Sequence, residues 1–161
     1  MAGPSCSVLS SEVTDSGELT NDLVRMVGND RDGGSFWVND TRKIGGAYVG
    51  EARPFILFSE PREKDEMSAI AEAIGWTPLL EIGLAAMCND SKDHRILGDM
   101  ALWLSERASG VVDLGGEISE LGDQATKVSY QTAAGHISCF SVLDPEGLRA
   151  WLGSTSFRMV K

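Results

Sequence analysis

The sequence predicts a single domain of the α+β class, in which one mixed, mostly antiparallel sheet packs against helices. Three observations support this class. The chain has 161 residues, the length of one domain. Its apolar and charged fractions, 42% and 24%, are ordinary for a globular protein. From residue 55 onward, strand-length apolar runs alternate with helical repeats and end in adjacent strands before a last helix.

The first 50 residues are rich in glycine and have a less regular pattern than the rest. Apolar residues at helical spacing predict a short amphipathic helix over about 17–28. Residues 35–38 and 47–49 predict strands around a glycine-rich turn. We therefore separate a less regular N-terminal part, residues 1–50, from an α+β core that follows it, residues 51–161.

The pattern becomes sharper in the core. The apolar run at 54–58 predicts a strand. Ser59 is the expected N-cap of a helix that has Pro61 in its first turn and ends at Gly75. The apolar segment 81–88 then predicts a buried strand, although its composition also suits a helix.

The strongest helical repeat lies over 92–108, and it follows an expected cap at Asn89-Asp90-Ser91. Its polar residues, Asp99 among them, are predicted to face outward. Residues 111–114 predict a further strand. A glycine-rich loop leads from there to the C-terminal elements.

The C-terminal elements are a hairpin and a helix. Residues 127–132 and 136–142 predict the two strands of the hairpin, joined by a short turn that contains glycine. Asp144-Pro145 is typical of a helix start. Residues 157–161 either trail off or add one more short strand.

The balance of charge indicates which partners suit the protein. The formal net charge is −10. Such a surface disfavours nucleic acid and anionic membranes, and it suits a basic protein partner. Acidity that serves only solubility is the alternative. The N-terminal residues predict no secretory signal, so the expected location is the cytoplasm.

The densest polar cluster admits two interpretations. Four of its residues, Cys88, Asp90, Asp93 and His94, are of types that bind zinc, yet their spacing fits no closed metal motif. Capping of the following helix explains the same segment without a metal. We therefore predict no metal site.

The three cysteines are expected to be buried free thiols. The glycine pairs match no phosphate-binding pattern, so no cofactor is expected.

An acidic loop is more distinctive. No lysine or arginine occurs between Arg107 and Lys127. Glycines in this stretch indicate a mobile, exposed loop, and such loops often carry binding. A solvated loop without a partner is the alternative. The candidate binding residues of this acidic loop are Asp113, Glu117, Glu120 and Asp123.

Five segments of the sequence have a familiar combination of residues: 84–90, 93–98, 110–116, 148–152 and 157–161. Together they resemble a bacterial family of unknown function. Its members are small cytosolic proteins, and we expect them to include immunity proteins of polymorphic-toxin or type VI secretion systems. The resemblance covers about residues 55–161 and carries over no catalytic residue.

The resemblance and the acidity together predict an immunity protein rather than an enzyme. Such a protein would block the active site of a cognate toxin or effector that is basic at the contact. Aromatic anchors usually dominate such interfaces, and the candidates are Trp37, Tyr48 and Trp76. Two alternatives stay open. One is a small cytosolic enzyme or metal-binding protein that uses Cys88, Asp93 and His94, and the other is a structural or ligand-binding module.

Overall fold

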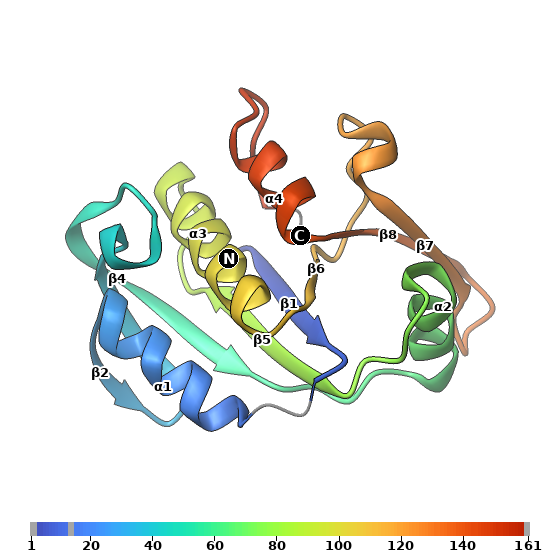
Figure 1. Ribbon diagram of the computed structural model, residues 1–161, viewed down its shortest axis with the longest axis horizontal. Helices are drawn as coiled ribbons and strands as arrows, with labels where there is room; N and C mark the ends of the chain where they lie inside the picture. The colour runs from blue at the N-terminus through green and yellow to red at the C-terminus, as the bar shows by residue number, and fades with distance from the viewer. Residues whose placement is uncertain (1–2, 13–14, 160–161) are drawn as a thin grey trace.

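The computed structural model describes residues 3–12 and 15–159, except for the side chains of residues 29–32. Within this part of the chain, four α-helices and eight strands form one domain (Figure 1). The helices are α1 (Ser16–Val27), α2 (Lys64–Ile74), α3 (Ser91–Arg107) and α4 (Pro145–Leu152). The strands are β1 (Ser5–Ser10), β2 (Gly28–Asp32), β3 (Ser35–Asp40), β4 (Val49–Phe58), β5 (Leu80–Ala86), β6 (Val111–Asp113), β7 (Thr126–Gln131) and β8 (Ile137–Leu143).

The eight strands form a single sheet in the order β2-β3-β4-β5-β1-β6-β8-β7. Every pairing among the described strands is antiparallel. The predicted α+β class is therefore confirmed. The first strand of the chain lies inside the sheet, between β5 and β6.

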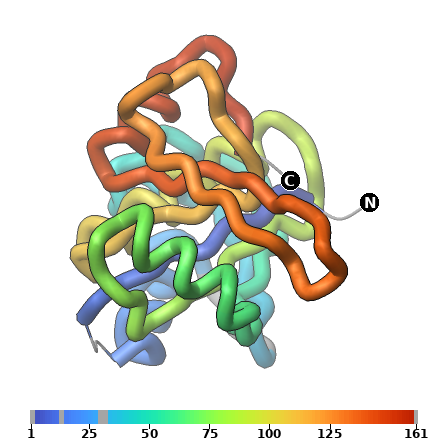
Figure 2. The backbone as a smooth tube through the Cα atoms, turned by 90° about the vertical axis from the view of Figure 1, so that its right-hand side faces the viewer, coloured from blue at the N-terminus to red at the C-terminus, as the bar shows by residue number. Residues whose placement is uncertain are grey.

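Helices cover both faces of the sheet, but unequally. On one face, α1, α3 and α4 enclose the main core, which includes Phe36, Phe55 and Trp151. On the opposite face, α2 packs beside β7 over a smaller core (Figures 1 and 2). That smaller core consists of Leu9, Ile70, Val128, Phe140 and Val142.

Most elements lie where the sequence predicts them. The first helix, the long helix α3, the strand at β5, the β7–β8 hairpin and the helix α4 are all confirmed within two residues. Asp144 caps α4, because its side chain accepts a hydrogen bond of 2.7 Å from the Gly147 amide. Residues 157–159 form no strand, and residues 160–161 lie outside the described part of the chain.

Three predictions about the elements are wrong. The helix expected from Ser59 begins instead at Lys64, so Pro61 precedes it. The strands expected at 47–49 and 54–58 belong mostly to one ten-residue strand, β4, with a register shift opposite β3. The first 50 residues are not a less regular part, because they supply α1 and three strands of the sheet.

Candidate functional site

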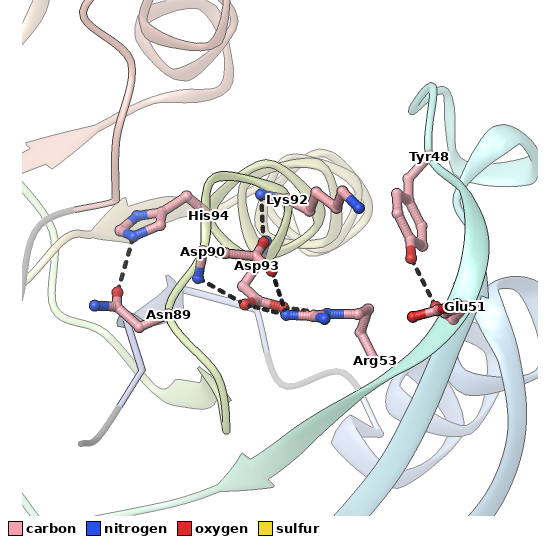
Figure 3. Close-up of polar contacts among 8 residues, drawn as sticks. All are labelled: Tyr48, Glu51, Arg53, Asn89, Asp90, Lys92, Asp93 and His94. Atoms are coloured by element: carbon pink, nitrogen blue, oxygen red, sulfur yellow. Dashed lines mark hydrogen bonds and ion pairs between the residues drawn. The ribbon is translucent and has the colours of Figure 1, made fainter.

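The cluster at the start of α3 is a capped helix end joined to the sheet (Figure 3). Asp90 is the N-cap, and it forms a capping box with Asp93. Arg53, from β4, donates from Nε and Nη2 to the two carboxylate oxygens of Asp93, at 2.8 and 2.7 Å. Its Nη2 also donates to Asp90 at 2.7 Å. The predicted capping role is confirmed, and Arg53 is a partner that the sequence did not indicate.

Electrostatics at this cluster favour the ion pair. Burial alone would raise the pKa of Asp93, but hydrogen bonds from Arg53 and the Asp90 amide outweigh it and lower this pKa. Hydrogen bonding to Asp93 raises the pKa of Arg53. Both groups are therefore held in their charged forms, and their ion pair links β4 to the start of α3.

His94 is held between two polar partners on the other side of the cluster (Figure 3). Its Nε2 lies 3.0 Å from the Asn89 side-chain oxygen, and its Nδ1 accepts a hydrogen bond of 2.9 Å from the Met159 amide. His94 thereby ties the C-terminal segment to α3. In the described residues, no group of three or more His, Cys, Asp or Glu side chains is placed to hold a metal ion.

The acidic loop divides into a buried part and an exposed part. Asp113 is buried, and its Oδ2 lies 2.7 Å from Nη1 of Arg62. Its Oδ1 accepts from the amide of Gly115, whose positive φ of 70° lets the chain turn there. The prediction that Asp113 belongs to an exposed binding surface without a neutralising cation is therefore wrong.

The other three carboxylates of the loop are exposed. Glu117 and Glu120 lie before a short 3-10 helix, Gly122–Gln124, and Asp123 lies in it. Among the described residues, none of the three side chains forms an ion pair. They remain candidates for contact with a partner.

The three aromatic candidates lie in separate places. Trp37 is 48% exposed on β3. Tyr48 is half-buried in the segment before β4, where its hydroxyl donates to the Glu51 carbonyl oxygen at 2.6 Å (Figure 3). Trp76 is half-buried after α2 and packs against the smaller core. The structure therefore does not gather these aromatic residues into one patch.

One hollow does join two predicted residues from distant parts of the sequence. Trp76 and Asp123 both line a hollow of about 520 Å³ between the end of α2, the 3-10 helix and the start of α4. Every charged residue that lines it is acidic. We call this feature the acidic hollow and define it by Trp76, Asp123, Asp144 and Glu146.

A second charged cluster, which the sequence analysis did not predict, is centred on Arg62. This guanidinium donates from Nε and Nη2 to the two carboxylate oxygens of Glu81, at 3.0 and 2.9 Å. It also pairs with Glu66 and Asp113. Burial alone would lower the pKa of Arg62, but the carboxylates raise it. Only Arg62 and Glu66, four residues apart, carry a local signal in the sequence.

Two further predictions about polar residues need correction. Asp99, expected to face outward from α3, is buried, and its Oδ1 lies 3.2 Å from Nε of Arg95. Burial raises the pKa of Asp99.

Of the three cysteines, only Cys6 is fully buried, while Cys88 is half-buried and Cys139 is exposed. Burial, and the nearby charge of Asp113, raise the pKa of the Cys6 thiol.

The fold and these clusters define a small α+β protein with an antiparallel eight-stranded sheet and an acidic surface. The chain belongs to a family of unknown function, DUF6368, whose model matches residues 2–161. No curated protein and no solved structure matches the chain. In the described residues, no helix has the length and apolar character needed to cross a membrane.

Proposed function

We propose that this protein is an immunity protein, which binds a cognate toxin or effector that is basic at the contact and blocks its active site. The observation that carries the proposal is the acidic hollow. It combines an aromatic side chain, Trp76, with three carboxylates and no cationic lining residue. The exposed Glu117 and Glu120 extend this acidic surface along the same loop.

The chemistry of the acidic hollow suits a basic protein surface. A half-buried indole offers a partner apolar area at small cost in conformational entropy, and aromatic residues are frequent binding hot spots. Carboxylates around it attract lysine and arginine side chains and speed the encounter. The net charge of −10 adds a long-range attraction for a basic partner.

The proposal also implies a location and an absence of catalysis. An antidote acts where its toxin acts, so we place the protein in the cytoplasm. Two of the three residues of the enzymatic alternative, Asp93 and His94, have structural partners that account for them. Asp93 holds Arg53, and His94 holds the Met159 amide. No second function is therefore proposed.

The test is charge reversal of the three exposed loop carboxylates. The partner probe is the product of the adjacent reading frame, which the proposal predicts to contain a toxin domain. We expect the variant with Glu117, Glu120 and Asp123 all changed to Lys to associate about tenfold more slowly at low salt. High salt should slow the wild type toward the same rate, because exposed charges are screened. Stopped-flow mixing would measure both rates.

A matched control distinguishes an effect of the loop's own charges from an effect of the protein's net charge. Glu12, Glu18 and Glu51 are exposed and do not line the acidic hollow, and their replacement by Lys changes net charge equally. We expect this control to bind with a rate closer to that of the wild type. Equal slowing in the two variants would remove the loop from the interface, and a wild type that does not bind would refute the proposed function.

A further inference from the structure

The sheet face that carries α2 is only partly covered. α2 packs over its β7–β8 end, whereas the surface of β3, β4 and β5 on this face has no helix over it in the described chain. Successive side chains of a strand point to opposite faces of the sheet. Phe36, Phe55 and Leu84 enter the main core, so the residues next to them in β3, β4 and β5 point to the uncovered face. These exposed or half-exposed residues are Trp37, Ile56, Phe58, Ala85 and Met87.

Four of these residues line a shallow groove of about 580 Å³, which we call the sheet groove: Ile56, Phe58, Ala85 and Met87. The Phe58 ring lies flat enough on β5 that a Cβ on Gly83 would come within 2.5 Å of it. Gly83 therefore makes room for the ring. Exposed apolar surface of this kind is a recurrent mark of a binding site.

A charged pocket of about 250 Å³ adjoins the sheet groove, and Ser5, Phe58 and Glu60 line both. The charged residues that line this pocket are Glu60, Glu66, Arg62, Glu81 and Asp113. Arg62 lies at the centre of three of the carboxylates. Four carboxylates against one guanidinium leave an excess of negative charge, so the pocket attracts a further cation.

The hydroxyl of a largely buried serine, Ser7, also opens into this pocket. Ser7 is 8% exposed, and it lies on the face opposite Cys6 and Val8, which enter the main core. Its cross-strand neighbours are Gly83 and Asp113, and it lines the charged pocket. Among the residues that the structure describes, none forms a hydrogen bond with the Ser7 side chain. A hydroxyl that lines a pocket and has no partner in the protein is available to a ligand.

We propose that the sheet groove and the charged pocket together bind a polypeptide segment that presents an apolar side chain next to a lysine or arginine. The apolar side chain occupies the sheet groove against Phe58 and Met87. The cationic group enters the charged pocket near Glu60 and Glu81, where Ser7 accepts a further hydrogen bond. This inference rests on the proposed function, because the segment belongs to a basic protein partner.

Charge decides between the possible occupants. A second copy of this chain would bring another net charge of −10 against the same carboxylates. A small apolar molecule would leave the charged pocket without a cation. A basic segment satisfies both halves of the site, and its cation can share the carboxylates of Arg62 without displacing it.

Two blocked dipeptides, Leu-Arg and Arg-Leu, are suitable probes. At millimolar concentration we expect one of them to shift the backbone amide NMR signals of Phe58, Glu60 and Ala85. The corresponding peptides with Gln in place of Arg should bind about tenfold more weakly, because they carry no cation. Equal shifts by the Gln peptides, or no shifts at these amides, would overturn the proposal.

Two pairs of variants test the two halves of the site separately. Glu60→Lys adds a cation at the junction of groove and pocket, whereas Glu63→Lys makes the same change three residues away, outside both. Met87→Glu places a charge at the sheet groove, whereas Leu79→Glu makes a similar change outside it. Met87 is 54% exposed and Leu79 is 64% exposed, so neither change disturbs a buried position.

We expect Glu60→Lys and Met87→Glu to weaken peptide binding about tenfold, and Glu63→Lys and Leu79→Glu to leave it near that of the wild type. Equal effects within each pair would refute the site. Concentration-dependent shifts of the same amides without peptide would show that a second copy occupies it. If the wild type binds the toxin domain but not the peptides, this inference fails alone. If it binds no toxin domain, the proposed function fails.

Discussion

The Arg53–Asp93 contact joins an edge of the main core to the start of the longest helix. Arg53 comes from β4, and Asp93 is fully buried in the first turn of α3. The guanidinium meets both carboxylate oxygens, a geometry that gives strong and directional hydrogen bonds. Removing the carboxylate of Asp93 breaks both of these bonds and leaves Arg53, whose side chain is 19% exposed, with Asp90 as its remaining ion-pair partner.

Asp93→Asn should therefore lower the free energy of unfolding by about 3 kcal/mol at neutral pH. The pKa of Asp93 is lowered in the folded protein, so its contribution is complete above its ordinary pKa of about 3.9. That contribution is lost as pH falls through the lowered pKa. The difference between wild type and variant should be constant down to about pH 4 and shrink below it. Urea unfolding at several pH values would measure it.

The exposed Asp65 offers a control for this prediction. Asp65→Asn should change the free energy of unfolding by less than about 0.5 kcal/mol over the same pH range. A difference for Asp93→Asn that does not shrink in acid would show that the charge of Asp93 contributes nothing to stability.

At the scale of residues, local roles were predictable and distant pairings were not. The capping of α3 was predicted, because Asp90 and Asp93 lie at the spacing of a capping box. Asp113 was misplaced, because its partner Arg62 is distant in the sequence. Asp99 was misplaced because other elements pack over α3 and bury it, although its partner Arg95 lies only four residues before it. The loop contains no cation of its own, and the cation that neutralises Asp113 comes from before α2.

At the scale of elements, β1 shows why part of the sheet escaped prediction. Its sequence, SCSVLS, mixes serine with apolar residues. Five of its six residues are buried, because the strand lies inside the sheet with cores on both faces. The small serines fit this position, but their composition resembles that of a loop. The later elements were predictable, because hydrophobic repeats that continue over many residues and clear helix caps mark them.

The inner position of β1 predicts a large effect of truncating its buried side chain. Leu9→Ala removes a fully buried side chain of the smaller core beneath α2. We expect a loss of about 3 kcal/mol in the free energy of unfolding. Ile137→Ala, at a side chain that is 71% exposed on β8, is the matched control and should change it by less than about 0.5 kcal/mol. Similar losses in the two variants would contradict the position of β1.

At the scale of the molecule, two candidate contact surfaces lie at opposite ends of α2. Glu66, in its first turn, lines the charged pocket, and Ile74, at its end, lines the acidic hollow. Both surfaces combine carboxylates with apolar area. The predicted residues Trp76 and Asp123 belong to the acidic hollow, whereas the sheet groove and charged pocket arise only when distant strands meet. A basic partner is the chemistry that suits both.

The proposed neutralisation of a toxin predicts that this protein protects growing cells. The product of the adjacent reading frame, which the proposal predicts to be a toxin, would be expressed in a bacterial host, alone and together with this protein. We predict that the toxin domain alone stops growth and that co-expression of the wild-type protein restores it. Growth arrest that persists although the protein is folded and abundant would contradict the account.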